Sequence, residues 1–469
     1  MATKPTIQLL GLALCVLGIY SGPNLAQSNN SSLLSELTPV TKEMLIDPPA
    51  EDWLLWRRTY ASSGFSPLDQ INRQNVAELE LAWRVELEPG PNSPTPIVHD
   101  GVVYLLSTGD TMLAMDAVSG AELWRYRHES DAVASAKIGI ALYGDKLFMP
   151  TANMHIVALD SRTGAPIWDS EITDLAVGPR SHRLRGTPLV ANGMLIQGVT
   201  ATMIPEGGFI IGLDLETGEE VWRFHSVARP GTPGGNTWND IPLEERSGGS
   251  VWLPGSYDPE LDLLYFGVGN GSPWNRAYRS PGPDGRGEGD NLYLSSIVAI
   301  RPDTGEYVWH YQTTPGETWD YTATQHIVLA DMEIDGRDRQ VLMQAPKNGY
   351  FYVLDRATGE FISAEPYIPL NWSTGMSADG RPQMNPETRI DITGKPALVM
   401  PGPLGGHNWH PMAYDPGENL VYIPAFEAAM LYSPEANWKP DRARGFNIGY
   451  DLGAGDLPPD LGIRCEVQG

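Results

Sequence analysis

The segment Ala158-Leu159-Asp160-Ser161-Arg162-Thr163-Gly164-Ala165-Pro166-Ile167-Trp168 decides the fold, because variants of it recur along the chain. Each copy begins with a small apolar pair, which Asp usually follows, and continues to Thr or Ser followed directly by Gly. In all copies but the last, a Trp lies four residues after the Gly. Four more copies, the last two looser, surround Gly120, Gly218, Gly305 and Gly359. Successive glycines are 44, 54, 87 and 54 residues apart, and the 87-residue step has room for one degenerate copy. Such periods are typical of propeller blades or a comparable array.

The repeat predicts a tight turn between two strands. Gly adopts a positive φ there, and the Asp or Thr side chain caps the local backbone. The Trp is a large planar filler for the gap between neighbouring sheets. Further hairpins are predicted at residues 97–104, 141–148, 189–196, 257–265 and 414–422, and the intervening sequence does not resemble an extended amphipathic helix. The sequence therefore predicts an all-β propeller of four-stranded antiparallel blades, docked to one another through tryptophans.

Charge and cysteine content exclude several classes of function. The chain of 469 residues has 32 Lys and Arg against 58 Asp and Glu, a formal charge of −26. This excess of acid argues against nucleic acid and anionic membrane surfaces as partners. With only Cys15 and Cys465, the sequence contains no disulfide framework, no Cys-based zinc site and no CxxCH haem-attachment motif.

The first residues have the layout of a secretory signal peptide. Lys4 precedes an apolar run over residues 7–20, and cleavage is expected after Ala26. An uncleaved N-terminal anchor is the alternative; no other segment approaches the length of a membrane span. We expect a signal peptide at 1–26, a polar lead at 27–51, a propeller at 52–426 and a Pro/Gly-rich tail at 427–469, in a periplasmic or secreted protein without a transmembrane span once processed.

Three stretches carry more polar and aromatic detail than a hairpin needs. In Gly269-Asn270-Gly271, the Asn offers a neutral oxygen that could bind a hard cation, or it is a plain turn residue. Asp320 between Trp319 and Tyr321 could be a base or metal ligand in a partly dry site, or a solvated loop residue. His407 and His410 lie three residues apart in a Gly-rich loop, a spacing there that does not favour a zinc site.

Together these stretches resemble the active-site segments of the quinoprotein alcohol dehydrogenases, which use pyrroloquinoline quinone (PQQ) and have an eight-bladed propeller. The resemblance rests on four ordered segments: 269–275, Trp319-Asp320-Tyr321, Ala345-Pro346-Lys347-Asn348-Gly349 and Gly406-His407-Asn408-Trp409. The opening segment from Trp53 to Trp83 is also similar to that family. In the family, further blades follow the part that matches 414–426, so the resemblance implies a C-terminally truncated chain and an incomplete ring.

The resemblance assigns roles residue by residue. It implies that Asn270 and Asp320 approach a Ca²⁺ ion held on the cofactor, and that Asp320 is the base taking the proton of the substrate hydroxyl. Thr322 stands where the lanthanide-using relatives have a second carboxylate, which favours calcium. Lys347 matches the cation that hydrogen-bonds the quinone carbonyls. Three further positions match cofactor contacts: Trp252, on which the quinone would stack, Asn408 and Trp409.

The sequence also departs from the family pattern. The region of the two adjacent cysteines, residues 132–139, has none, and the usual arginine aligns with Ile138, beside Lys137 as a possible substitute. The family's metal-binding glutamate aligns near Met203, and Glu206 is the nearby carboxylate that could reach the metal. A cofactor-contacting glutamate is replaced by Ser93.

Two functions follow from this pattern. The first is a periplasmic dehydrogenase that oxidises an alcohol or sugar hydroxyl by hydride transfer to Ca²⁺-bound PQQ, with electrons leaving to a separate acceptor such as a cytochrome c or a quinone. The second is a catalytically inactive propeller that serves as a binding or assembly scaffold. The missing glutamate, arginine and cysteine pair favour the scaffold. Retention of Trp252, Asn270, Asp320, Lys347 and Asn408 together favours the enzyme.

Overall fold

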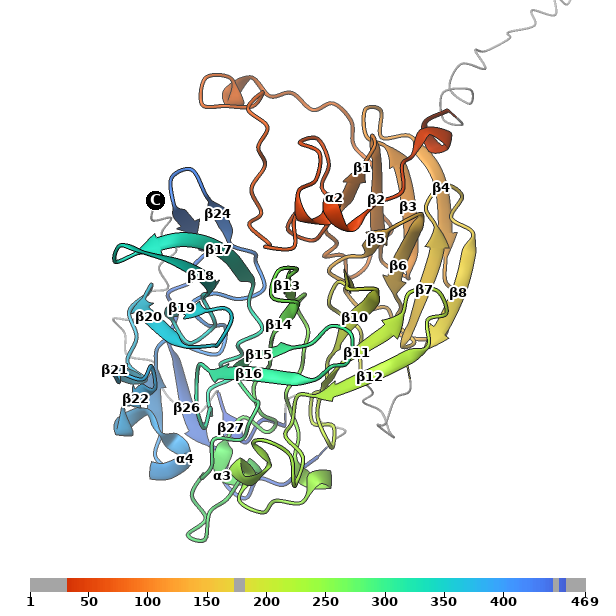
Figure 1. Cartoon of the computed structure of the whole chain (residues 1–469). Helices are drawn as coiled ribbons and strands as arrows, with labels where there is room; N and C mark the ends of the chain where they lie inside the picture. The colour runs from red at the N-terminus through yellow and green to blue at the C-terminus, as the bar shows by residue number, and fades with distance from the viewer. Residues whose placement is uncertain (1–31, 173–181, 442–446, 453–469) are drawn as a thin grey trace, which may run out of the picture.

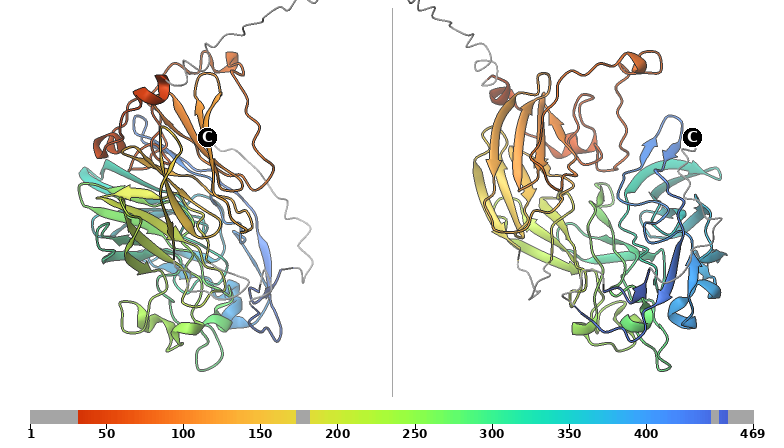
Figure 2. Two further views of the ribbon diagram at one scale, coloured as in Figure 1. Left: turned by 90° about the vertical axis from the view of Figure 1, so that its right-hand side faces the viewer. Right: turned by 180° about the vertical axis from the view of Figure 1, so that it is seen from behind.

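Five four-stranded antiparallel sheets follow one another along the chain, in the computed structural model of residues 32–172, 182–441 and 447–452. Figure 1 shows the sheets along an arc from the orange blade to the teal one, and Figure 2 shows the same order from the side and from behind. They confirm the predicted blades. The predicted signal peptide at 1–26 lies outside the described residues, as do parts of 27–51 and of 427–469.

Each blade pairs its strands in chain order. The first is β1 (Ile97–His99), β2 (Val102–Ser107), β3 (Thr111–Asp116) and β4 (Glu122–Arg127), and the second is β5 (Ala141–Tyr143), β6 (Lys146–Pro150), β7 (His155–Asp160) and β8 (Pro166–Glu171). The third is β9 (Leu189–Ala191), β10 (Met194–Val199), β11 (Phe209–Asp214) and β12 (Glu220–His225). The fourth is β13 (Ser256–Asp258), β14 (Leu263–Gly267), β15 (Ser296–Ile300) and β16 (Tyr307–Gln312), and the fifth is β17 (Ile327–Ile334), β18 (Arg337–Gln344), β19 (Tyr350–Asp355) and β20 (Phe361–Pro366).

Three smaller sheets and short helices complete the described chain. The sheets are β21 (Ser373–Met376) with β22 (Pro382–Met384), β24 (Ala413–Asp415) with β25 (Leu420–Tyr422), and β23 (Ala397–Val399) with β26 (Met430–Pro434) and β27 (Tyr450–Asp451). Strands β26 and β27 lie in the segment expected as a Pro/Gly-rich tail. Residues 32–36 are helical, and the other helices are α2 (Lys42–Ile46), α3 (Arg276–Arg279), α4 (Ile390–Thr393) and the 3₁₀ turns η1 (Val76–Glu78), η2 (Gly235–Trp238), η3 (Leu243–Glu245) and η4 (Pro386–Thr388). Among the described helices, none combines the length and the apolar character that a membrane crossing requires.

The predicted hairpins form with the expected partners. Ile97 pairs with Tyr104 in the first blade, and Leu189 pairs with Ile196 in the third. The 87-residue step has room for a degenerate copy, but the described structure has no additional blade there. Two long connections, residues 226–255 and 268–295, account for the additional length. They contain η2, η3, α3 and irregular backbone.

The repeat holds each blade to the next. The indole N–H of Trp168 donates to the Leu215 carbonyl at 3.2 Å, directly after the Asp of the following copy, and Trp124 makes the same bond to Ser161 at 3.1 Å. The ring covers the glycine of that copy: a Cβ on Gly218, where φ is +73°, would lie 2.7 Å from Trp168. Glycine is therefore needed both for the turn and for the close approach of the indole.

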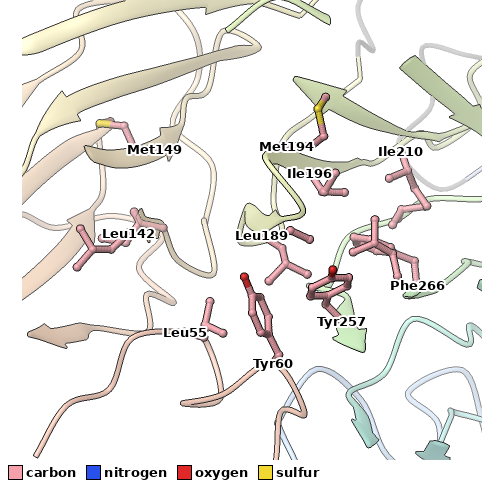
Figure 3. Close-up of a cluster of buried hydrophobic side chains, with 14 of the residues drawn as sticks. Leu55, Tyr60, Leu142, Met149, Leu189, Met194, Ile196, Ile210, Tyr257 and Phe266 are labelled. Carbon is pink, nitrogen blue, oxygen red and sulfur yellow. The ribbon is translucent and has the colours of Figure 1, made fainter. Parts of the chain in front are cut away.

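The largest apolar cluster links several blades near the inner strands. Figure 3 shows Leu142 and Met149 of the second blade and Leu189, Met194 and Ile196 of the third facing the same interior as the segment that carries Leu55 and Tyr60. The Tyr60 ring meets Tyr257 of the fourth blade edge-on at 4.9 Å, and its hydroxyl donates to the Val190 carbonyl at 2.8 Å. This packing fixes the blades relative to one another.

Candidate active site

A cavity of about 470 Å³ lies at one end of the third, fourth and fifth blades. In an antiparallel blade, the connection that enters the first strand and the one that leaves the second strand are at the same end of the sheet. The lining residues come from connections of both kinds. They are Arg183, Arg185, Thr200, Thr202, Ser250, Trp252, Asn270, Asp320, Thr322 and Lys347. Four residues singled out from the sequence, Trp252, Asn270, Asp320 and Lys347, thus share one cavity.

The turn that carries Asp320 is anchored on both sides. Trp319 and Tyr321 are fully buried, and their backbone N–H groups both donate to Glu317 Oε1, at 2.6 and 2.9 Å. Asp320 itself adopts a left-handed conformation with φ of +71°. A non-glycine residue in that conformation is strained, and such strain is common at functional sites. The aromatic anchors therefore hold the carboxylate toward the cavity.

Asp320 is paired with a cation across the cavity wall. Lys347 Nζ donates to Asp320 Oδ2 at 2.9 Å, and both side chains are largely buried. Burial raises the pKa of Asp320, and the attraction and hydrogen bond of Lys347 only partly oppose this rise. The pair comes from two connections of the fifth blade, since Asp320 precedes β17 and Lys347 follows β18.

Asn270 is positioned by a backbone contact that requires glycine. The Gly249 N–H donates to the Asn270 carbonyl at 2.9 Å, and a Cβ on Gly248, with φ of +109°, would lie 2.5 Å from that oxygen. The side-chain amide of Asn270 donates to the Gly271 carbonyl at 3.0 Å. Its Oδ1 is left without a hydrogen bond among the described residues, so it is available as a neutral oxygen ligand.

The segment 248–252 also carries Trp252, the predicted aromatic platform. The guanidinium carbon of Arg185 lies 5.9 Å from the centre of the Trp252 ring. Arg183 and Arg185 both reach the cavity from the connection that enters β9. No sequence motif marks either arginine, although any polar residue directly before a first strand is at this end of its blade.

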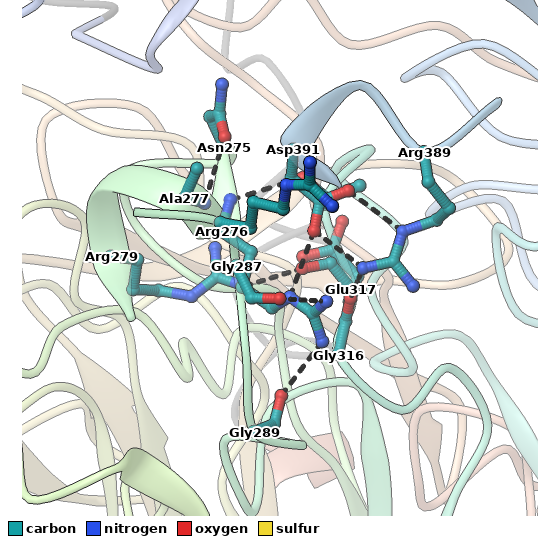
Figure 4. Close-up of polar contacts among 12 residues, drawn as sticks. Asn275, Arg276, Ala277, Arg279, Gly287, Gly289, Gly316, Glu317, Arg389 and Asp391 are labelled. Atoms are coloured by element: carbon teal, nitrogen blue, oxygen red, sulfur yellow. Dashed lines mark hydrogen bonds and ion pairs between the residues drawn. The ribbon is translucent and has the colours of Figure 1, made fainter. Parts of the chain in front are cut away.

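A buried charge cluster supports the Asp320 turn from behind (Figure 4). Arg279 of α3 donates to the Glu317 carbonyl at 2.5 Å. Asp391 accepts from Arg389 and from Arg276, with its carboxylate oxygens 2.6 to 3.0 Å from their nitrogens. The long connection between β14 and β15 is thereby tied to α4 and to the turn that precedes Asp320.

Other predicted residues are not part of the lining of this cavity. The Glu206 carboxylate lies 2.8 Å from Arg229, and Lys137 Nζ lies 3.7 Å from Asp110. Asn408 donates to the Leu404 carbonyl at 2.7 Å, and the ring of Trp409, which is 45% exposed, stacks on His410. Neither Glu206 nor the pair Asn408 and Trp409 is therefore in the lining, although the loop of Asn408 contacts Lys347, whose carbonyl accepts from the Gly406 N–H at 2.9 Å.

His407 is held by backbone groups. It is buried, and its Nδ1 and Nε2 lie 2.7 and 2.5 Å from the carbonyl oxygens of Ala345 and His410. These contacts fix the Gly-rich loop against the segment that carries Lys347.

Comparison with known proteins assigns the family. The family described as PQQ, glucose/ethanol/alcohol dehydrogenase, beta-propeller domain, matches residues 53–366. The chain belongs to this family. It is 45% identical over 405 residues to the quinohemoprotein alcohol dehydrogenase ADH IIB of Pseudomonas putida, covering 82% of this chain and 57% of that protein.

Two further proteins are similar over most of this chain. The 1-butanol dehydrogenase (cytochrome c) of Thauera butanivorans is 36% identical over 84% of this chain and 59% of its own length. The solved structure of the quinohemoprotein alcohol dehydrogenase ADHIIG of Pseudomonas putida superposes with a TM-score of 0.82 at 40% identity, over 88% of this chain and 63% of that one. The chain thus spans less than two thirds of the length of each of these relatives.

Proposed function

We propose that this chain carries the catalytic centre of a PQQ- and calcium-dependent dehydrogenase that oxidises an alcohol or sugar hydroxyl in an exported protein. The observation that carries the proposal is the cavity in which Asp320, strained and ion-paired to Lys347, meets Asn270 and Trp252. Family membership supports the cofactor, and the name of the Thauera relative supports a cytochrome c as electron acceptor.

The lining residues fit the two groups that this function requires. The cavity has the volume of a small-molecule site and combines an indole ring with three cationic side chains, which suits a flat anionic molecule such as PQQ. Asp320 and the free Oδ1 of Asn270 are hard oxygen donors of the kind that Ca²⁺ prefers. Calcium takes six to eight ligands, so the cofactor and water would supply the rest.

Each residue has a definite task in the proposed reaction. Bound PQQ supplies the two-electron acceptor for the hydride, and calcium supplies a Lewis acid. Asp320 accepts the hydroxyl proton of the alcohol at its carboxylate, which lines the cavity beside Lys347. Lys347 keeps that carboxylate in place through its hydrogen bond, and the buried Trp319 and Tyr321 exclude water from the turn.

The test separates binding from chemistry. The purified chain is titrated with PQQ in the presence of Ca²⁺, and Trp fluorescence is compared with a titration in chelator. Saturable, calcium-dependent quenching is expected, and dye-linked alcohol oxidation should fall about 10² to 10⁴-fold in Asp320→Asn. Asp284→Asn, which changes an exposed aspartate, is the control with unchanged activity. Failure of a folded chain to bind PQQ would favour the inactive scaffold, and full activity of Asp320→Asn would reject the assigned base.

A further inference from the structure

Two arginines of the third blade form a second cationic feature of the cavity. Arg183 and Arg185 are two residues apart in the extended segment that enters β9, where Arg183 bridges to Thr200. Side chains two apart in an extended segment point to the same side. Both arginines accordingly line the cavity, and both remain exposed to it.

No carboxylate among the described residues neutralises these two charges. Among the described residues, no carboxylate lies within ion-pair distance of either guanidinium group. The single carboxylate in the cavity lining belongs to Asp320, which is already paired with Lys347. Two unneutralised cations side by side repel each other, so an anion at this position would stabilise them.

A third cation lies behind the pair. Lys137 is 4% exposed, bonds to Ser135 Oγ at 2.7 Å and lies 3.7 Å from Asp110. Burial lowers the pKa of Lys137 to about 8; Asp110 opposes this, and repulsion from Arg183 and Arg185 adds to it. The backbone N–H of Ile138 donates to the Arg185 carbonyl at 2.9 Å, so the three cations belong to one rigid region. One carboxylate for three cations leaves a local excess of positive charge.

The surroundings of Arg185 indicate the shape of the missing anion. Its guanidinium lies near the face of Trp252, the flat platform of the cavity. An anionic group bound by Arg185 would therefore lie beside the Trp252 ring. Carboxylate and phosphate both match the fork of a guanidinium through paired hydrogen bonds, and of the two the carboxylate is the planar group that a flat molecule carries in its own plane.

We propose that Arg183 and Arg185 bind a carboxylate group of the molecule held in this cavity. The inference rests on the proposed function for the identity of that molecule and deepens it. The carboxylate is either one of those on PQQ or one on an anionic alcohol substrate. Lys137, which the sequence suggested as the substitute for the family's missing arginine, is directed to Asp110, and the arginine pair takes that place.

The experiment compares three versions of the full chain. One is Arg183→Gln with Arg185→Gln, and the second is the charge-retaining pair Arg183→Lys with Arg185→Lys. The control is Arg125→Gln with Arg127→Gln, which removes two exposed arginines of the same spacing on β4, outside the cavity lining. Circular dichroism and the thermal midpoint verify folding. Binding of PQQ with Ca²⁺ is followed by Trp fluorescence, and binding of benzene-1,3,5-tricarboxylate, a redox-inactive probe, by calorimetry.

The expected result is a loss of affinity for benzene-1,3,5-tricarboxylate of about tenfold or more in the glutamine pair, because charge-assisted hydrogen bonds are lost. The lysine pair should retain part of the affinity, and the control should retain all of it. A parallel loss for PQQ assigns the carboxylate to the cofactor. Unchanged PQQ affinity with a raised KM for lactate, but not for 1-propanol, assigns it to the substrate.

Two outcomes separate this inference from the proposed function. If the wild-type chain binds the tricarboxylate in an arginine-dependent way but does not bind PQQ, the arginine site stands and the proposed cofactor is wrong. If the glutamine pair binds the tricarboxylate and PQQ as the wild type does, and its KM for lactate is unchanged, the inference is overturned.

Discussion

Asp391 is the residue whose replacement should weaken the framework behind the active site most. Its side chain is fully buried, and both oxygens bond to Arg389, one of them also to Arg276 (Figure 4). Asp391→Asn keeps the shape but leaves two buried guanidinium groups without a countercharge. Removing one partner of a buried ion pair costs about 3 to 5 kcal/mol of unfolding free energy, and we expect about 3 kcal/mol because the amide oxygen remains an acceptor.

The control is an ion pair of similar geometry at the surface. Asp290 binds Arg381 through both oxygens, at 3.0 and 2.7 Å, but the two side chains are 35% and 55% exposed. Asp290→Asn should therefore lose no more than about 1 kcal/mol. Equilibrium unfolding in denaturant measures both variants. If Asp391→Asn loses no more stability than Asp290→Asn, the charge cluster does not support the fold as argued.

The same substitution should have a defined pH dependence. Burial raises the pKa of Asp391, but the attraction and hydrogen bonds of Arg389 and Arg276 outweigh burial, and the net pKa is lowered. A lowered pKa means that the stabilisation is present above the ordinary aspartate value of about 3.9 and is lost as the pH falls through the folded-state value. The difference between wild type and Asp391→Asn should thus be full at pH 6 and shrink in acid.

Three shorter predictions concern the turn, the blade contacts and the N-terminal segment. Glu317→Ala should lower dye-linked activity about tenfold or more, because it releases the backbone amides beside Asp320. Glu317→Gln should keep most of the activity. Burial raises the pKa of Glu317 to about 7, and the side-chain amide of Gln keeps an acceptor oxygen. Trp168→Phe should cost about 1 kcal/mol in denaturant unfolding for the lost indole hydrogen bond, and Trp168→Ala clearly more. Burial lowers the pKa of His99, but its hydrogen bonds to Asp52 and the Thr38 carbonyl outweigh burial, and the net pKa is raised. The loss of stability in His99→Gln should therefore be largest below pH about 6.5 and decline as the pH rises through the pKa of His99 in the folded protein.

The blades were predictable because their determinants are local. The turn from Asp160 to Gly164 contains its own hydrogen-bond acceptors: Asp160 Oδ1 accepts from the Arg162 and Thr163 amides at 3.1 and 2.8 Å. The Trp that follows needs only the next copy to dock. The content of the 87-residue step was not predictable, because spacing alone does not distinguish a degenerate blade from the long connections that contain α3.

The site was predictable where a motif lies directly at a strand end. Asn270 follows β14 and Lys347 follows β18, so each reaches the same end of its blade whatever the remaining fold. Glu206 shows the limit of this reasoning. It is three residues from the position that matches the family's glutamate, but an ion pair with Arg229, distant in sequence, directs its carboxylate elsewhere. Proximity along a loop does not fix the direction of a side chain.

Local charge was the least predictable property of the site. The formal charge of −26 is a sum over the whole chain, and it says nothing of where the few cations gather. Lys347 lies more than 160 residues after Arg183 and Arg185, and the three share a cavity only because successive blades place the same ends of their strands together. Asp320 neutralises one of them. An acidic chain therefore contains a cationic cavity, which its net charge alone would not have predicted.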